Sequence, residues 1–433
     1  MSGSTQSASC WPSKPPSRCA NTFSGLTPPR PGRDTASATL EVELPLWTNW
    51  SGRIDAQPKR IETPRHEKDL ATLLAQSDLS DLKVRVAGTG HSHSALVPSD
   101  DIIVDLKSLS GVVGIDPNHR WARILAGSPI SRLGKPLREA GVALLNQGDI
   151  DRQTISGATA TGTHGTGRRL QNLSAAVQGM RMILHDGQIV ECDAQREPEL
   201  FEASRLNLGA FGIVTEITVA VRPAYRLQEK LWLESLDDVL DRIETLTQAT
   251  RHFEFFWMPG SSRAACKSLE ETQLAAVYPL ASEGNRLAWS DEVLANDRPE
   301  RHTEMEYSVP IDKGPECFRA LRRLIRESFP SLQWPLEYRT LAADNVWLST
   351  AYDRQCATIS VHQGIDSDEG PVFRACEEIF CEYEGRPHWG KVHFQNAEAL
   401  AAAHPRWEDW WRVRDLWDPD GRFLNDHVAA WRP

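Results

Sequence analysis

Short runs of apolar and β-branched residues alternate with glycine-rich turns in the first half of the chain. This alternation is typical of strands that are separated by tight turns. Two segments between these runs, 66–76 and 131–141, have helical spacing, and the second ends at Gly141 as a helix C-cap does. The predicted strands lie at residues 83–88, 101–106, 120–127, 180–192 and 212–221.

The pattern changes after Pro223. Longer segments follow, with a strand-like run at 225–234, a helical pattern at 236–248 and an aromatic run at 252–259. A second domain is therefore predicted from about residue 226. The aromatic segment 407–431 is helical in pattern, and whether it packs on the first or the second domain stays open.

Composition narrows the class of protein. The 433 residues carry 48 Lys and Arg against 59 Asp and Glu, a net charge of −11, which argues against a nucleic-acid partner because no basic surface is available. No run approaches the roughly 18 apolar residues of a membrane span. The eight cysteines form no CxxC pair, as expected in a reducing compartment. We expect a soluble cytoplasmic protein with a flexible Ser/Pro-rich tail at 1–44.

The first segment with chemical content is 84–94, VRVAGTGHSHS, in which a strand runs into a turn with glycines two residues apart. Glycine lets the backbone approach a ligand and direct its N–H groups at a phosphate. A nicotinamide fingerprint needs a third glycine three residues after Gly90 and a helix directly afterwards. Position 93 is His and the next segment is strand-like, so this alternative fails.

A second Gly/Thr-rich segment, QTISGATATGTHGTG, occupies residues 153–167. One glycine loop is weak evidence, whereas two loops in one domain suit a long cofactor that contains phosphate. A zinc site built from His91, His93 and His164 is a minor alternative, because no carboxylate or Cys lies at a usual ligand spacing.

The chain resembles the vanillyl-alcohol-oxidase-type FAD oxidoreductases, in the branch of the sugar-1,4-lactone and alditol oxidases. The resemblance lies in the order and spacing of the two glycine segments and of residues 206–219, 337–354, 357–364 and 386–393. The resemblance covers roughly residues 45–433. It implies an α+β fold with an FAD-binding domain at 45–225, a substrate (cap) domain with an antiparallel sheet flanked by helices at 226–395, and a C-terminal helical segment, 396–433, that packs back on their interface.

The resemblance also implies which residues hold FAD. In the family the His of the G-H-S turn is bonded to the flavin, so covalent attachment through His91 is expected. The full set of cofactor-binding positions is His91, Gly88, Thr89, Gly90, Ser92, Gly148, Asp149, Ile155, Ser156, Gly157, Thr161, Gly162, His164 and Val214.

Four residues of the second half are the expected catalytic groups. Glu337 and Arg339 alternate on a strand-like run and so share a face, where their attraction is expected to keep Glu337 ionised. The resemblance places this pair at the substrate, Lys391 against the flavin to stabilise its reduced anion, and His362 as a proton acceptor.

The resemblance further implies oxidation of an aldono-1,4-lactone at its C2 hydroxyl by hydride transfer to flavin N5. Gly148 is expected to leave a path for molecular oxygen, so that the product of reoxidation is H2O2. Alditol oxidation and a lactone dehydrogenase with another acceptor are the alternatives. A metal-dependent hydrolase or a sugar-binding protein also stays open, although neither explains two Gly/Thr loops before residue 225.

Overall fold

The computed structural model describes residues 44–76 and 81–433. The predicted tail at 1–44 thus lies outside the described residues except for its last position. Within the described part, no helix is both long and apolar enough to cross a membrane.

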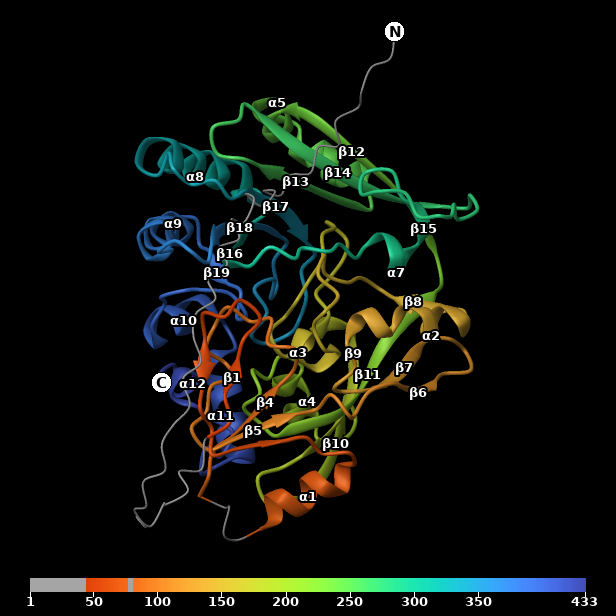
Figure 1. The fold of residues 1–433 in the computed structure, drawn as a ribbon, viewed down its shortest axis with the longest axis vertical. Coiled ribbons are helices and arrows are strands. Elements are labelled where there is room, and N and C mark those ends of the chain that lie inside the picture. Colours follow the sequence, from red (N-terminus) through yellow and green to blue (C-terminus); the bar gives the residue numbers. More distant parts are fainter. Residues whose placement is uncertain (1–43, 77–80) are drawn as a thin grey trace, which may run out of the picture.

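The first half of the chain forms two sheets, which lie in the lower half of Figure 1. A parallel three-stranded sheet has the order β3-β5-β4, and an antiparallel sheet has the order β10-β9-β11-β7-β6, with β8 paired to β11; a short β1-β2 ladder precedes them. Four of the five predicted strands are found as predicted, and the fifth, at 180–192, is divided into the antiparallel pair β9 and β10. The strands are β1 Trp47–Thr48, β2 Asp55–Ala56, β3 Arg60–Glu62, β4 Val84–Ala87, β5 Ile102–Asp105, β6 Val112–Ile115, β7 Trp121–Leu125, β8 Val142–Leu144, β9 Val177–Ile183, β10 Ile189–Asp193 and β11 Ile213–Pro223.

The second half forms one eight-stranded sheet, which confirms the predicted antiparallel sheet. Its order is β15-β12-β14-β13-β17-β18-β16-β19, and every described pairing in it is antiparallel. The strands are β12 Arg226–Ser235, β13 His252–Trp257, β14 Arg263–Thr272, β15 Leu287–Trp289, β16 His302–Pro310, β17 Leu336–Leu341, β18 Cys356–Gly364 and β19 Arg386–Pro387.

Helices flank both parts. In α8 the buried residues recur at helical spacing, and Phe318 packs edge to face on Phe255 of the sheet at 5.0 Å between ring centroids. The helices are α1 Glu67–Ala75, α2 Gly134–Glu139, α3 Ile155–Ala160, α4 Pro198–Ser204, α5 Leu236–Asp241, α6 Ile243–Ala249, α7 Ser290–Val293, α8 Gly314–Ser328, α9 Gly370–Glu382, α10 Ala397–Ala403, α11 Trp407–Trp417 and α12 Asp426–Ala429.

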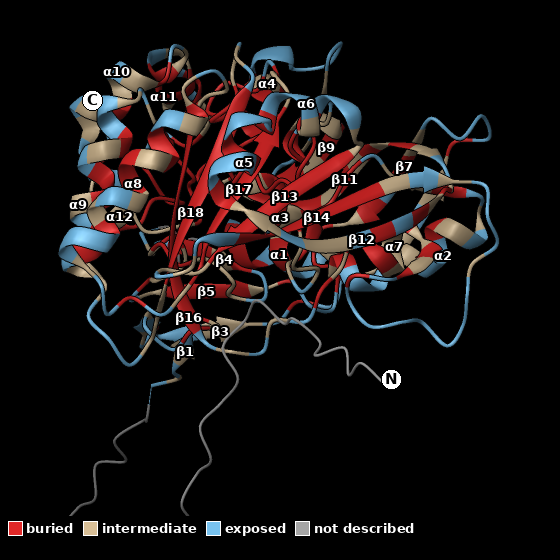
Figure 2. Ribbon diagram, turned by 90° about the horizontal axis from the view of Figure 1, so that it is seen from above, coloured by how far each residue is buried: buried red, intermediate tan, exposed pale blue. Residues whose placement is uncertain are grey.

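Two large hydrophobic cores correspond to the two halves, and the buried strands run through both (Figure 2). The core of the first half also contains Trp407, Trp410 and Trp411 of α11, so the C-terminal helices return to the N-terminal sheets. Arg85 of β4, fully buried, donates hydrogen bonds to the carbonyls of Leu208 and Phe423. Segment 407–431 thus contributes to the core of the first half, while its packing on the interface of the two predicted domains stays a prediction.

Candidate active site

The first glycine turn follows β4 and is held by the segment before it. The N–H of Trp50 donates to the carbonyl of Gly90 at 2.8 Å, and the side-chain amide of Asn49 donates to the carbonyl of Ser92 at 2.9 Å. Gly90 has a φ of +72°, and a Cβ there would lie 3.3 Å from the Cα of Asn49. A side chain at position 90 would therefore be strained and crowded, which explains the glycine.

His91 lies against the indole of Trp50, with ring centroids 5.0 Å apart and planes 21° from parallel. Burial lowers the pKa of His91 to about 4, and the positive charges of Lys391 and His302 act in the same direction. Near neutral pH the imidazole is therefore uncharged, which is the state that a nucleophilic ring nitrogen requires.

The second Gly/Thr segment begins helix α3 beside the first turn. Thr154 caps the helix by accepting a hydrogen bond from the N–H of Gly157 at 3.2 Å. A Cβ at Gly88 would lie only 2.5 Å from Oγ1 of Thr154, so the two loops touch where glycine is required. The two segments that the sequence singled out thus form one wall.

This wall lines a first cavity of about 880 Å³, whose other side is formed by residues 207–214. Glycine backbone, hydroxyl groups and a helix N-terminus suit a phosphate-containing dinucleotide, so the residues present fit FAD. Of the predicted cofactor positions, those that line it are Gly88, Thr89, Gly90, His91, Ser92, Ser156, Gly157, Thr161 and Val214.

Two predicted cofactor positions line neither this cavity nor the second cavity, which is described below. Ile155 is fully buried in the core, and Gly162 adopts a φ of +74° with its Cβ position 3.0 Å from Leu206. The cavity also includes residues that the sequence did not single out, among them Gln153, Leu96, Val97, Asn207, Leu208 and Gly209.

A second cavity of about 630 Å³ lies between the glycine loops and the eight-stranded sheet. Gln153 lines both cavities, so the two spaces adjoin. Here the structure brings together the four predicted catalytic residues and three of the predicted cofactor positions. The lining residues with predicted roles are Gly148, Asp149, His164, Glu337, Arg339, His362 and Lys391.

Glu337 and Arg339 share one face of β17, as the alternation predicts, with 3.3 Å between Arg339 Nε and Glu337 Oε1. The expected ionisation of Glu337 is wrong, however. Burial raises the pKa of Glu337 to about 8 against the pull of Arg339, and the nearby carboxylates of Glu254 and Asp149 raise it further. At neutral pH Glu337 is therefore a carboxylic acid that can donate a hydrogen bond.

Lys391 follows the short strand β19 in a tight turn. The Lys391 N–H donates to the carbonyl of His388 at 2.9 Å, and the Gly390 N–H donates to Nδ1 of His388 at 3.0 Å. The Lys391 ammonium contacts the carboxylate of Glu304 on β16. Burial alone would raise the pKa of Glu304, but the positive charge of Lys391 holds this pKa well below its usual range.

His362 lies on β18 with Nδ1 2.8 Å from the carbonyl of Pro335, so its proton is on Nδ1. Nε2 lies 3.7 Å from Oε1 of Glu304. Burial lowers the pKa of His362 to about 4 even though Glu304 opposes that shift. A neutral ring with its lone pair on Nε2 has the form that a proton acceptor needs.

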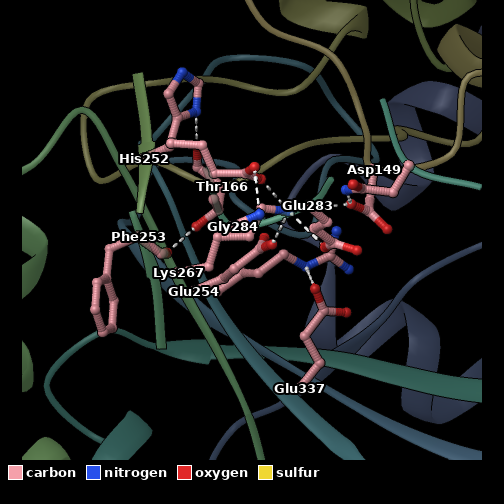
Figure 3. Close-up of polar contacts among 12 residues, drawn as sticks. Asp149, Thr166, His252, Phe253, Glu254, Lys267, Glu283, Gly284 and Glu337 are labelled. Carbon is pink, nitrogen blue, oxygen red and sulfur yellow. Dashed lines mark hydrogen bonds and ion pairs between the residues drawn. The ribbon is translucent and has the colours of Figure 1, made fainter. Parts of the chain in front are cut away.

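Asp149 is held by side chains of the second half. Its carboxylate lies 3.3 Å from Arg298 and 3.6 Å from Lys267, and it accepts a hydrogen bond from the amide of Asn296. Burial would raise its pKa, but Arg298 and Lys267 lower it to about 2. Figure 3 shows Asp149 and Glu337 beside the cluster around Lys267. The observed partners of Asp149 are thus two cations and one amide, at one edge of the second cavity.

Sequence reasoning missed the acidic face of β16, where His302, Glu304 and Glu306 follow one another at every second position. The signal that could have found them is the presence of ionisable residues at every second position within a buried strand. His388 and Arg298, which also line the second cavity, were missed as well.

The minor zinc alternative is not supported. His93 lies with His302 beside Trp50, whereas His164 contacts Glu306 and His388. Among the described residues, no group within ligand distance combines His91, His93 and His164.

The sequence of the chain is similar to known families of proteins. The family model of D-arabinono-1,4-lactone oxidase matches residues 217–291 and 275–431, and that of the FAD binding domain matches residues 58–193. The L-gulono-1,4-lactone dehydrogenase of Mycobacterium tuberculosis is 33% identical over 423 residues, which cover 89% of this chain and 98% of that protein. The chain belongs to the sugar-lactone oxidase family. It is accordingly an FAD-dependent oxidoreductase that acts on CH–OH groups.

Other members of the family are also similar over almost their whole length. The alditol oxidase of a Streptomyces species is 28% identical over 411 residues, covering 87% of this chain and 97% of that protein. The L-gulonolactone oxidase of Mus musculus is 22% identical over 427 residues, covering 88% and 96%. Membership of this family sets aside the hydrolase and sugar-binding alternatives.

The fold is that of the vanillyl-alcohol-oxidase-type flavoproteins. The crystal structure of cholesterol oxidase from B. sterolicum superposes with a TM-score of 0.78 at 15% identity, covering 92% of this chain and 99% of that one. At this identity the likeness shows the fold alone, and it confirms the predicted α+β class.

Proposed function

We propose that this family member oxidises an aldono-1,4-lactone at its C2 hydroxyl with oxygen as the electron acceptor. The observation that carries the proposal is the second cavity, which adjoins the FAD-fitting cavity at Gln153 and is lined by carboxyl, imidazole and ammonium groups. Such a lining suits a small polyhydroxylated substrate, whose hydroxyls need both donors and acceptors. Relatives named for gulono- and arabinono-lactones support the lactone class.

FAD, when bound, supplies the hydride acceptor at flavin N5. The protonated carboxyl of Glu337 donates a hydrogen bond to a substrate oxygen, and Arg339, beside it on the same face of β17, donates to a neighbouring substrate oxygen. His362 accepts the hydroxyl proton at Nε2 as the hydride leaves the carbon. Lys391 places a positive charge where the cofactor becomes anionic.

The attachment of FAD is proposed to be covalent, through His91. Its support is a neutral imidazole that lies in the first cavity and is fixed against Trp50. Acid precipitation of the purified protein tests this point: the yellow colour should stay with the washed pellet. Colour that moves to the supernatant would mean that FAD is bound without a covalent bond, and a His91→Ala variant provides the non-covalent reference.

Comparative kinetics test the substrate. L-gulono-, L-galactono- and D-arabinono-1,4-lactone should give a higher kcat/KM than xylitol or sorbitol. The reverse order would make the protein an alditol oxidase, which is the second candidate because the Streptomyces relative carries that name.

The acceptor is tested separately by mixing reduced enzyme with air or with cytochrome c. Rapid reoxidation by air with formation of H2O2 is expected, because Gly148 lines the second cavity without a side chain. Reoxidation by cytochrome c alone would identify a dehydrogenase, as the name of the Mycobacterium relative indicates for that protein.

A further inference from the structure

A short hairpin that no step of the proposed reaction uses lies against the turn that carries His91. Residues 49–54 connect β1 to β2, and the buried side chain of Asn49 closes this connection. Its Oδ1 accepts hydrogen bonds of 3.0–3.1 Å from the backbone N–H groups of residues 52–54. Because Oδ1 is the acceptor, the other end of the amide is the donor, and Nδ2 donates to the carbonyl of Ser92 at 2.9 Å.

The hairpin binds the backbone on both sides of His91. On one side, the Trp50 N–H donates to the carbonyl of Gly90 at 2.8 Å. On the other side, the amide of Asn49 donates to the carbonyl of Ser92. The indole of Trp50 stacks on the imidazole, with 5.0 Å between the ring centroids and 21° between the planes. Two consecutive residues of the hairpin thus hold both the main chain and the ring of His91.

The cap supports this arrangement. The guanidinium of Arg53, in the same hairpin, donates to the carbonyl of Ile365 at 3.0 Å and forms an ion pair with Glu369. The indole of Trp50 also lies edge to face with His302 of β16, at 5.2 Å between the ring centroids. Trp50 therefore has one ring partner on the glycine turn and another on the cap sheet, and both restrict its orientation.

We infer that Asn49 and Trp50 are positioning residues, which hold the imidazole of His91 in the orientation for its bond to the flavin. The inference rests on the proposed covalent attachment and names the residues on which the rate of that attachment depends. Neither side chain takes part in the bond. Their contribution is the alignment of the two reacting atoms, and a displacement of about 1 Å can slow a reaction about 100-fold.

The bond that depends on this alignment joins one ring nitrogen of His91 to the 8α-methyl carbon of the flavin. The nitrogen gives up its hydrogen, the methyl group gives up one of its own, and both leave as protons. The electron pair of the broken C–H bond stays on the flavin until oxygen, the acceptor of the proposed reaction, takes it up with two protons as H2O2. The reaction therefore needs no reactant beyond the protein, FAD and oxygen.

The rate of attachment tests the inference. The full-length chain is produced without flavin in a riboflavin-starved strain and mixed with FAD in air, and samples taken over time are precipitated with acid to measure the flavin that the washed pellet retains. A series of FAD concentrations gives the maximal rate of attachment and the FAD concentration at half of that rate. Loss of positioning lowers the maximal rate, whereas general damage to the cofactor cavity raises the half-saturating concentration.

Two substitutions remove the contacts to the turn of His91. Asn49→Asp keeps the oxygen that accepts from the N–H groups of the hairpin and replaces the donor to Ser92 by a second acceptor. Trp50→Leu removes the stacked ring. Each should lower the maximal rate about tenfold or more and leave the half-saturating FAD concentration close to that of the wild type. Trp50→Phe, which keeps an aromatic ring, should restore at least part of the rate.

Ser51→Ala is the matched control, since it changes the same hairpin. The buried hydroxyl of Ser51 donates to Oδ1 of Asn49 at 3.2 Å, within the connection of β1 to β2. Its removal should leave the maximal rate close to that of the wild type. A loss as large as that in Asn49→Asp would mean that the integrity of the hairpin, and not its contacts to the turn of His91, determines the rate, and would overturn the inference.

Failure of the inference and failure of the proposed attachment give different results. If the wild type retains flavin in the pellet, an unchanged maximal rate in Asn49→Asp or in Trp50→Leu would overturn the inference alone. A rise in the half-saturating FAD concentration without a fall in the maximal rate would do the same. A wild type that binds FAD but never retains it in the pellet would refute the covalent attachment through His91, and the inference with it.

Discussion

Among the charged residues of the cap, Lys267 is expected to lower the stability of the fold most when it is substituted. It is 2% exposed on β14, and its ammonium lies 2.9 Å from Glu254, 3.5 Å from Glu283, 3.6 Å from Asp149 and 3.9 Å from Glu229 (Figure 3). At an effective dielectric constant of about 20, each pair attracts by about 4–6 kcal/mol. Dehydration of the ammonium offsets much of this, and removing one partner of a buried pair costs about 3–5 kcal/mol.

Lys267→Met keeps the length of the side chain and removes its charge, so it should lower the unfolding temperature by roughly 6–20 °C, at about 2–4 °C per kcal/mol for a unit of this size. Thermal unfolding followed by tryptophan fluorescence measures the shift. Lys230→Met is the matched control, because Lys230 is exposed on the neighbouring strand β12 and its loss should change stability by less than about 0.5 kcal/mol.

The loss of stability in Lys267→Met should depend on pH. The lowered pKa of Asp149 means that its ion pairs stabilise the fold above the pKa of the unfolded chain and cease to do so as the pH falls towards about 2. In Lys267→Met the uncompensated carboxyl groups take up protons in acid, so the deficit should be larger at about pH 7.5 than at about pH 4.5. A deficit no greater than that of Lys230→Met, or one independent of pH, would refute this account of the cluster.

Three further predictions concern the reaction. Glu337→Gln should retain most activity below neutral pH, because Glu337 is already protonated there. Its kcat/KM profile should lack the ionisation near pH 8 that is expected of the wild type, and identical profiles of the two proteins would contradict the raised pKa. Lys391→Met should slow anaerobic reduction of the flavin by about 100-fold or more in stopped-flow measurements while FAD stays bound, and an unchanged rate would exclude its proposed role. Gly148→Ala should slow reoxidation by air without loss of stability, since the added Cβ meets its nearest atoms at 3.4 Å; unaltered reoxidation would show that oxygen reaches the cofactor by another path.

Local features of the fold could be predicted from the sequence. The β-rich runs, the glycine turn at Gly88 and Gly90, and the shared face of Glu337 and Arg339 each depend on neighbouring residues and on the periodicity of a strand. The family resemblance supplied the cofactor and the reaction class, which residue spacing alone did not give.

Properties that depend on several distant strands could not be predicted. The protonation of Glu337 follows from carboxylates on β13 and on the loop at Asp149, more than 80 residues away from it in each case. The cap strands pair out of sequence order, so the neighbours of Lys267 and Glu306 are fixed only in the folded sheet. Sequence reasoning assigned Glu337 the charge of an isolated ion pair because these partners were not visible to it.

The return of the C-terminal helices to the N-terminal sheets affects the order in which the protein can be completed during synthesis. The Val84 N–H donates to the carbonyl of Arg422 at 2.8 Å, and Trp410 donates to the carbonyl of Leu206. The cofactor core therefore cannot close until the ribosome has translated the chain past Arg422, whereas all strands of the cap sheet have been made by Pro387. The cap is free to fold first, and chains that terminate before Trp407 are expected to keep a folded cap without retaining FAD.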